Sequence, residues 1–578
     1  MEYKRHTLAH LLAAAVLEKY PHAKLTLGPA IENGFYYDID FSGGATPGDE
    51  DLKGLQKQMK KLLNKWTEFT HEEVSPEEAR RRFADNPYKL ELIDEIVTKG
   101  EPITLYTCGG FTDLCRGGHV AHPKEEIDPN AFKLDKIAGA YWRGDEKNPM
   151  LTRIYGLAFN TKAELEAYEK QRLEAQKRDH RKLGKELDLF TFSELVGPGL
   201  PLFTPKGTLM RDLIVNKIAE IQSQYGYHKV TIPHITKSDL YKTSGHWDKF
   251  KDELFHVTGK SDTEFVMKPM NCPHHTQIFA SQPRSYKELP IRYAETTMVY
   301  RDEQAGELIG LSRVRSITQD DGHVFCTVEQ IEQEIENIVK VIKEFYTALD
   351  MYKEGEFWVS LSVSDPKEPE KYLGDKDTWQ KAEEVLEQVA KRLSLPYKRV
   401  EGEAAFYGPK IDFMFNDALG RERQLATAQL DFIMPERFGL EYTDKDGKKR
   451  TPVMIHRAIA GSLERFMAIM IEHFAGAFPL WLSPVQLAVI PVAEAHTEYA
   501  SQVVEKLRKH NFRVELYDGK DSMGKKIRQA KQQKLPYFIV IGDKELENNS
   551  VTLESRDRDE SVVMSIDELL DKLQTETA

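Results

Sequence analysis

The largest region of the chain is characterised by TMVYRDE at residues 297–303, followed by LSRVRSITQDDGHVF at residues 311–325. Both stretches contain runs with the composition of β-strands, and QLATAQLDF at residues 424–432 contains another. No regular helix separates these runs, so we expect a mostly antiparallel sheet rather than a doubly wound parallel one. We assign residues 188–478 to this region.

Three further regions flank the central one. Residues 1–160 combine a helix over 3–20 with a β-rich stretch over 24–41, which indicates an α+β unit. Residues 161–187 are highly charged and rich in helix formers, so we expect a solvated linker helix. The last region, 479–578, alternates strand and helix and is expected to be a small α/β domain with parallel pairing.

Composition excludes several classes of protein. The chain has 578 residues, of which 40% are apolar and 30% are charged, as in a folded globular protein and unlike a disordered or collagen-like one. No apolar run approaches about 18 residues, so we expect no membrane span. The first residues do not resemble a secretory signal, and four cysteines are too few for a disulfide framework. We therefore expect a cytoplasmic protein.

The net charge of −13 argues against a protein that coats nucleic acid. A local basic patch remains compatible with it, because KRDHRKLGK at residues 177–185 carries five Lys or Arg in nine residues. A helix over 525–534 is a second basic candidate. Either could contact phosphates without the rest of the chain being basic.

The first chemical constellation lies near the N-terminus. HTLAH places His6 and His10 four residues apart on one face of the expected helix, and DLCRGGH supplies Asp113, Cys115 and His119. Three imidazoles and a thiol could form a tetrahedral zinc site. They could equally form a metal-free hydrolytic site in which imidazoles activate a water. The residues alone leave both interpretations open.

The second constellation is dispersed along the central region. Cys272 lies in KPMNCPHH, His323 in TQDDGHVF and His456 in VMIHRAIAGSLERF. One thiolate and two imidazoles suit a catalytic zinc with an open position, but spacing alone does not assemble them, and His274 and His275 compete. No GxxxxGK[ST] motif occurs, so any nucleotide would be held by side chains such as arginine forks.

Long motifs then resemble a known family. KPMNCP, YRDE, RVRSITQDDGHVF, FYGPKIDF, QLDF, VMIHRAIAGSLERF and RDHRKLGKELDLF are similar to threonyl-tRNA synthetase, a class II aminoacyl-tRNA synthetase. The resemblance extends over essentially the whole chain. It implies a threonine–tRNA ligase that activates L-threonine with ATP, charges tRNA(Thr), and hydrolyses mischarged seryl-tRNA(Thr). It also implies a homodimer, one Zn²⁺ per subunit, and Mg²⁺ bound with ATP.

The resemblance assigns regions and residues. Residues 1–160 would be the editing domain, 188–478 the class II catalytic domain and 479–578 the anticodon-binding domain. A strand ending at Pro233 would lie at the dimer interface. The implied ATP-binding residues are Arg301, Glu303, Arg313, Gln424 and Arg465, of which the three arginines are also the catalytic ones. The implied amino-acid site consists of Gln319, Asp321, Tyr407, Lys410 and Gln429. The implied metal ligands are Cys272, His323 and His456, and the implied editing residues are His6, His10, Asp113, Cys115 and His119. The implied anticodon-binding residues are Lys525, Arg528 and Glu545, with Gly524 beside them.

The chain departs from the family pattern in three places. It begins at the editing domain, without the N-terminal ubiquitin-like domain, which we expect to affect tRNA binding or editing rather than catalysis. His274 replaces a common glycine beside the metal cysteine and could disturb or join the metal shell. LATAQLDF replaces a strand that usually contains more glycine, with no expected consequence.

Three other interpretations are compatible with parts of the sequence. A non-catalytic tRNA-binding paralogue would have lost a motif arginine or a metal ligand, and none is missing. A synthetase for another amino acid is disfavoured by Asp321 beside a Cys/His/His set, which suits a β-hydroxy substrate. A metallohydrolase driven by the N-terminal site leaves most of the chain unexplained.

Overall fold

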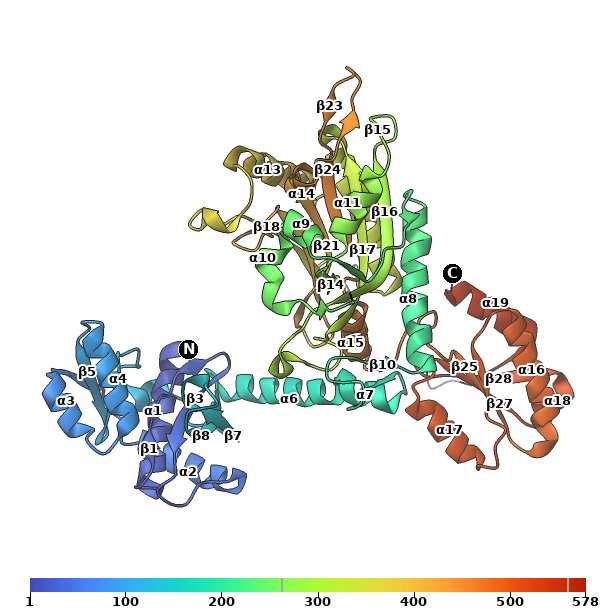
Figure 1. Cartoon of the computed structure of the whole chain (residues 1–578). Coiled ribbons are helices and arrows are strands. Elements are labelled where there is room, and N and C mark those ends of the chain that lie inside the picture. The colour runs from blue at the N-terminus through green and yellow to red at the C-terminus, as the bar shows by residue number, and fades with distance from the viewer. Residues whose placement is uncertain (261–262, 559–560, 578) are drawn as a thin grey trace. The chain divides into compact units, whose positions relative to one another are not determined.

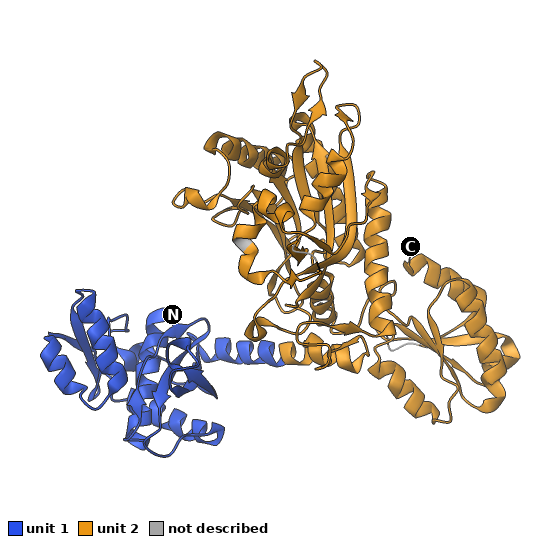
Figure 2. Ribbon diagram, viewed as in Figure 1, with its two compact units in different colours: residues 1–173 blue, residues 174–578 orange. Residues whose placement is uncertain are grey.

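The computed structural model describes residues 1–260, 263–558 and 561–577. The chain forms two compact units, residues 1–173 and 174–578, coloured separately in Figure 2. Among the described residues, no helix is both long and apolar enough to cross a membrane. The elements are labelled in Figure 1, and each unit is considered by itself.

The first unit is built around one buried helix. The helices are α1 (Glu2–Lys19), α2 (Leu52–Leu63), α3 (Pro76–Arg82), α4 (Pro87–Thr98) and α5 (Pro123–Glu126). The strands are β1 (Lys24–Leu25), β2 (Ala30–Ile31), β3 (Gly34–Asp40), β4 (Thr70–Val74), β5 (Ile103–Cys108), β6 (Phe111–Leu114), β7 (Phe132–Tyr141) and β8 (Met150–Ala158). Helix α1, expected from the sequence, packs against the sheet β1-β3-β8-β7. Residues 7–16 of α1 are all buried, which also draws His10 into the interior.

An eight-stranded sheet forms the centre of the second unit. In spatial order its strands are β11 (His228–Lys229), β16 (Ile291–Tyr300), β17 (Ser316–Cys326), β24 (Val453–Ala458), β21 (Glu422–Asp431), β20 (Lys410–Asn416), β18 (Phe357–Val363) and β19 (Tyr397–Glu401). The inner pairs are antiparallel, as predicted, and only the two edge strands pair in parallel. The register sets His323 directly opposite His456, and His456 opposite Gln429.

Helices and short strands surround this sheet. The helices are α8 (Pro205–Ser223), α9 (Asp239–Ser244), α10 (His246–Phe250), α11 (Cys272–Ala280), α12 (Ile331–Ala348), α13 (Lys376–Arg392), α14 (Ile433–Arg437) and α15 (Leu463–His473). The short strands are β9 (Phe190–Thr191), β10 (Leu202–Phe203), β12 (Ile235–Lys237), β13 (His256–Val257), β14 (Phe265–Met267), β15 (Arg284–Ser285), β22 (Tyr442–Thr443) and β23 (Lys449–Arg450). Helices α8, α12 and α15 contribute to the largest apolar core together with the sheet.

The C-terminal part adopts the expected α/β pattern and adds two strands. Its elements are β25 (Leu487–Pro491), α16 (Thr497–Lys509), β26 (Val514–Leu516), α17 (Met523–Gln532), β27 (Tyr537–Ile541), α18 (Asp543–Asn548), β28 (Ser550–Ser555), β29 (Ser561–Ser565) and α19 (Ile566–Thr577). Strand β25 pairs in parallel with β26 and β27, as predicted. Strands β28 and β29, which the sequence analysis did not predict, continue the sheet in antiparallel fashion.

The charged segment at 161–187 forms two helices where we expected one. Helix α6 (Lys162–Arg178) ends before Asp179, whose side chain accepts a hydrogen bond from the Arg181 amide and caps α7 (His180–Glu186). Helix α7 buries His180, Leu183 and Gly184 and packs against α15. The C-terminal part of the segment is therefore docked on one face and solvated only on the other.

A buried ion pair holds two central strands and the start of α15 together. Asp320 of β17 accepts hydrogen bonds from Arg457 Nη1 at 2.8 Å, from the Ile459 amide at 2.7 Å and from the Ala460 amide at 3.1 Å. Arg457 and Asp320 are both 1% exposed. Removing one member of such a pair leaves the other charge buried without compensation.

We therefore predict that Asp320→Ala lowers the free energy of unfolding by about 3–5 kcal/mol. Lys353→Ala is the matched control, because Lys353 pairs with Asp350 at the surface, and it should change stability by no more than about 0.5 kcal/mol. Urea unfolding followed by intrinsic fluorescence measures both. Equal midpoints for the two variants would contradict the structural role given to Asp320.

Candidate functional sites

The three predicted metal ligands converge from separate elements. Cys272 is the first residue of α11, His323 lies on β17 and His456 on β24. One ligand atom from each lies within 4.8 Å of the others, and all three residues are buried. His323 Nε2 and His456 Nδ1 are 3.1 Å apart. The second predicted constellation is therefore assembled by the fold.

The outer ring nitrogens of both histidines have partners of their own. His456 Nε2 lies 2.9 Å from Asp431 Oδ2, and His323 Nδ1 lies 2.7 Å from His275 Nδ1. His275 Nε2 in turn faces Glu295 Oε2 at 3.6 Å. This leaves His323 Nε2, His456 Nδ1 and the Cys272 sulfur directed at a common point. The residues therefore fit a metal ion held by three protein ligands whose imidazoles are oriented from behind.

Burial sets the protonation of the cluster. It raises the pKa of the Cys272 thiol well above its usual value, and the nearby Asp321 and Asp431 raise it further. Burial also lowers the pKa of His323 well below its usual value, with smaller contributions from His275 and His456. A neutral imidazole is the form that ligates a metal, whereas the thiol must lose its proton to do so.

Two further histidines adjoin the cluster with different geometries. His246 Nε2 lies 3.8 Å from the Cys272 sulfur, and burial lowers the pKa of His246 to about 3. His274 is 7% exposed, and neither of its ring nitrogens has a hydrogen-bond partner among the described residues. The three-donor group does not include His274.

The residues expected to bind the amino acid lie around the Cys272/His323/His456 cluster. Gln319, Asp321 and His323 alternate along β17 and so share one face of the sheet. Asp321 Oδ2 accepts a hydrogen bond from Asn271 at 3.0 Å, and burial raises the pKa of Asp321. The Tyr407 ring lies 5.1 Å from the His456 ring. Gln429, opposite His456 in the sheet, donates to the Gly408 carbonyl at 3.2 Å.

The residues expected to bind ATP are held in ion pairs and hydrogen bonds. Arg313 contacts Glu303 at 2.6 Å and Glu307 at 3.1 Å. Gln424 donates a hydrogen bond to Asp412 Oδ1 at 2.8 Å. The other oxygen of Asp412 pairs at 2.7 Å with Lys410, which is expected in the amino-acid site.

The other two arginines, Arg301 and Arg465, have no acidic ion-pair partner among the residues that the structure describes. The Arg301 guanidinium lies 5.3 Å from the Phe250 ring centre and 3.1 Å from the Met270 sulfur. Burial lowers the pKa of Arg465, and the like charge of Arg423 lowers it further. A bound anion would stabilise both cations.

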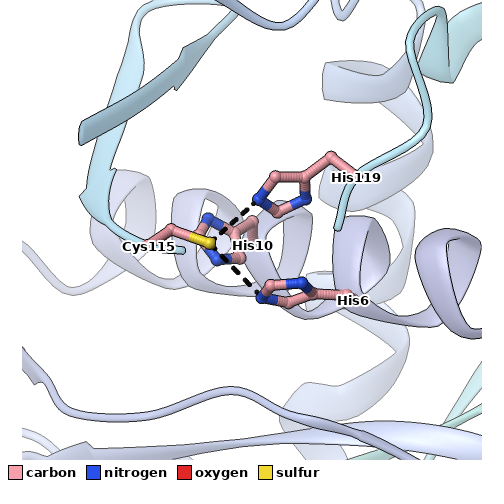
Figure 3. Close-up of side chains that lie close together, drawn as sticks. All are labelled: His6, His10, Cys115 and His119. Atoms are coloured by element: carbon pink, nitrogen blue, oxygen red, sulfur yellow. Dashed lines mark hydrogen bonds between the residues drawn. The ribbon is translucent and has the colours of Figure 1, made fainter. Parts of the chain in front are cut away.

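The first predicted constellation also assembles, in the other unit. Figure 3 shows His6 and His10 projecting from α1 toward Cys115 and His119. The Cys115 sulfur lies 3.6 Å from His6 Nε2 and 3.2 Å from His119 Nε2. One ligand atom from each of the four residues lies within 4.8 Å of the others. Three of the four, His6, His10 and Cys115, line a cavity of about 750 Å³.

Asp113 belongs to a neighbouring buried network rather than to the four-donor cluster. Its carboxylate contacts Lys89 Nζ at 2.6 Å and Tyr37 OH at 2.5 Å, and Lys89 Nζ lies 3.3 Å from Tyr37 OH. Lys89 and Asp113 are 2% and 1% exposed. Neither Lys89 nor Tyr37 has a sequence signal for this role, because a lysine within a helical pattern is normally expected to be solvated.

Burial controls protonation here as well. It lowers the pKa of His119 to about 2, with help from His10 and His6, and lowers that of His10 well below its usual value. Burial raises the pKa of the Cys115 thiol to about 11. At neutral pH the cluster therefore offers unprotonated imidazoles and a protonated thiol, which suits general-base activation of a water better than thiolate attack.

The anticodon candidates separate into two kinds. Lys525 and Arg528 are exposed on α17. Glu545 is engaged internally, because its carboxylate accepts hydrogen bonds from the Gly542 amide at 2.9 Å and from Thr552 Oγ1 at 2.6 Å. A contact between any of the three and RNA stays a prediction.

Three protein families match separate parts of the chain. The tRNA synthetase class II core domain (G, H, P, S and T) matches residues 255–474, and the anticodon binding domain matches residues 486–576. The threonyl and alanyl tRNA synthetase second additional domain matches residues 103–155. The three matches fall on the central sheet, the C-terminal α/β part and the first unit.

Whole-chain relatives agree with these matches. The threonine–tRNA ligase of Rubrobacter xylanophilus is 50% identical over 96% of this chain and 85% of its own length. That of Thermotoga neapolitana is 46% identical over 100% of this chain and 88% of its own.

Two solved structures are similar to about 70% of the chain. One described as the RNA binding domain of threonyl-tRNA synthetase from Cryptosporidium parvum has a TM-score of 0.65 at 37% identity, covering 69% of this chain and 98% of that one. A Giardia lamblia prolyl-tRNA synthetase, at 18% identity and a TM-score of 0.55 over 70% of this chain and 80% of that one, shares the fold. With identities near 50% over almost its full length, the chain belongs to the threonyl-tRNA synthetase family of class II aminoacyl-tRNA synthetases.

Proposed function

We propose that the chain is a threonine–tRNA ligase. It joins L-threonine to ATP, forming threonyl-adenylate and pyrophosphate, and transfers the threonyl group to the 3′ end of tRNA(Thr). The observation that carries this proposal is the buried Cys272/His323/His456 cluster with Asp321 on the same face of β17. The N-terminal unit hydrolyses mischarged seryl-tRNA(Thr).

The cluster distinguishes threonine from valine, in which a methyl group takes the place of the threonine hydroxyl. When bound there, Zn²⁺ supplies an open coordination position for the amino and hydroxyl groups of the substrate. Asp321 accepts the hydrogen bond of the threonine hydroxyl, and valine leaves this buried carboxylate unsatisfied. A site built to engage a hydroxyl rejects the analogue that lacks it by roughly 10⁴–10⁵. Gln319, Tyr407, Lys410 and Gln429 enclose the amino acid.

The arginines stabilise negative charge on the phosphates of ATP. Arg301 contacts the α-phosphate, Arg313 the γ-phosphate side, and Arg465 completes the set, while Glu303 and Gln424 hold the nucleoside. Mg²⁺ bound with ATP would neutralise part of the remaining phosphate charge. The threonine carboxylate attacks, so no side-chain nucleophile is needed. Arg313 exchanges its pairs with Glu303 and Glu307 for phosphate oxygens.

A second, hydrolytic site is needed because serine retains the hydroxyl. One missing methyl group is worth only roughly 10–200-fold in selectivity, so serine is activated as well. In the N-terminal unit a neutral imidazole of His6, His10 or His119 removes a proton from water. The Cys115 thiol and the Asp113 carboxylate, which Lys89 and Tyr37 hold in place, orient the substrate. We favour this metal-free interpretation of the cluster.

The remaining assignments follow the family resemblance. We propose domain limits of 1–160 for editing, 161–187 for the linker, 188–478 for catalysis and 479–578 for anticodon binding. The enzyme acts in the cytoplasm as a homodimer whose interface includes the segment from β11 to Pro233. The strand β11 ends at Lys229, four residues earlier than the sequence predicted. Exposed Lys525 and Arg528 contact the tRNA.

The first test is amino-acid-dependent ATP–pyrophosphate exchange on protein of measured zinc content. We expect strong exchange with threonine, weaker exchange with serine and none with valine, together with one zinc per chain. Exchange with valine equal to that with threonine would contradict the role of the cluster. Absence of all exchange at full zinc content would favour a tRNA-binding paralogue.

The outer partner of His456 provides a second prediction. Asp431→Asn should weaken zinc binding by about 10–100-fold, because the carboxylate that orients the imidazole is lost. Competition with a chromophoric chelator measures the affinity. Glu436→Gln, an exposed carboxylate five residues further on, is the control and should bind zinc as the wild type does. Unchanged affinity in Asp431→Asn would remove Asp431 from the site.

The editing cluster provides a third prediction. His119→Ala and Cys115→Ala should each slow hydrolysis of seryl-tRNA(Thr) by at least about 100-fold, while threonine exchange stays at the wild-type rate. Since burial lowers the pKa of His119 to about 2, this imidazole is unprotonated throughout the mildly acidic and neutral range. Wild-type hydrolysis should therefore show no loss of rate through protonation of His119 between pH 5.5 and 7.5. A tenfold fall over that range would contradict the assignment of His119 as a neutral base.

A further inference from the structure

One buried histidine of the linker segment contacts both helix α15 and the stretch of chain that carries Arg313. His180, the first residue of α7, is 3% exposed. Its Nδ1 lies 2.7 Å from Glu472 Oε1 on α15, and its Nε2 lies 3.1 Å from the backbone nitrogen of Leu311. Leu311 belongs to the irregular stretch between β16 and β17 that carries Arg313. A residue of the charged linker therefore contacts the chain next to an ATP-binding arginine.

The hydrogen-bond pattern determines the role of each ring nitrogen. The Leu311 amide can only donate, so His180 Nε2 must accept. His180 Nδ1 then carries the proton and donates to Glu472. A single imidazole thus accepts from the loop with one nitrogen and donates to α15 with the other, and neither contact can be reversed.

The loop fits closely against this imidazole. Gly310 has a φ of +49°, and a Cβ atom added to it would lie 2.4 Å from His180 Nε2. Only glycine combines this backbone conformation with such a close approach. Across the turn, the Ile309 amide donates a hydrogen bond to the Arg313 carbonyl at 3.2 Å. The position of the Leu311 amide therefore constrains the backbone from which Arg313 projects.

The other end of the imidazole is equally well anchored. The second carboxylate oxygen of Glu472 accepts a hydrogen bond from Arg421 Nη2 at 2.5 Å. The Glu472 side chain is only 13% exposed. Glu472 lies two turns after Arg465 on the same helix, α15. The Glu472–His180–Leu311 chain therefore connects the helix of Arg465 with the loop of Arg313.

We propose that His180 is a positioning residue for ATP, which holds the 309–313 turn at a fixed place relative to α15. The inference rests on the proposed function, in which Arg313 and Arg465 contact the phosphates of ATP. His180 does not touch substrate itself. This positioning role gives the RDHRKLGKELDLF segment a function beyond that of a linker between domains.

Two substitutions separate the contacts. His180→Asn retains an amide N–H near the position of Nδ1 and loses the acceptor for Leu311. His180→Gln retains an acceptor near the position of Nε2. Because one hydrogen bond is lost, His180→Asn should raise KM for ATP in the exchange assay by roughly 3- to 10-fold, with KM for threonine unchanged. His180→Gln keeps the contact with the Leu311 amide and loses only the donor to Glu472, so its KM for ATP should rise less than that of His180→Asn, again with KM for threonine unchanged.

Lys182→Ala is the control, since Lys182 is an exposed neighbour on α7, and it should leave both constants unchanged. A fall in the folded fraction lowers kcat and leaves KM unaltered, so partial unfolding does not mimic the expected effect. An unchanged KM for ATP in His180→Asn, or equal rises of both KM values, would overturn the inference. Absence of exchange in the wild type would instead contradict the proposed function.

Discussion

The antiparallel pairing of β17 with β24 sets His323 opposite His456, and most of the catalytic region depends on that register. Successive side chains of a strand point to opposite faces, so a slip of one residue would turn His323 away from His456 and move Asp321 with it. The Asp320–Arg457 pair lies in the same two strands and is buried between them. Because Asp320 also binds two backbone amides just before α15, the same carboxylate ties the helix of Arg465 to the register.

The two sites use burial for related purposes. In both, imidazoles are removed from water, which lowers the pKa of His323 and of His119 and keeps the rings unprotonated. What surrounds them differs. Carboxylates lie close to the Cys272/His323/His456 cluster, at Asp431 and Asp321, and would compensate a cation bound there. Beside the His6/His10/Cys115/His119 cluster, the carboxylate of Asp113 is already neutralised by Lys89, so that cluster carries less uncompensated negative charge. This contrast favours a metal at the Cys272 cluster and water activation at the N-terminal cluster.

The linker segment is highly charged, yet part of it is buried against the rest of its unit. Its composition predicts a solvated helix, and much of its surface is indeed exposed. The break at Asp179 turns the chain so that α7 presents His180 and Leu183 to α15. Neither the break nor the docking has a strong signal in hydrophobic periodicity, because the buried face consists of only three residues. In the sequence, His180 is one polar residue among lysines and arginines, and only its contacts with Glu472 and Leu311 distinguish it.

The sequence by itself determined the class of fold, the α1 helix with His6 and His10 on one face, the parallel start of the C-terminal sheet and, through long motifs, the residues of both clusters. These are properties of local pattern and of residue identity. Only the tertiary structure decided that His275 and Asp431 contact the ring nitrogens of His323 and His456, that Lys89 neutralises Asp113, that His274 stays outside the three-donor group and that His180 joins α15 to the 309–313 turn. The physical reason is that each of these contacts joins residues brought together by strand register and helix docking, and a single sequence does not encode such distances in any local pattern.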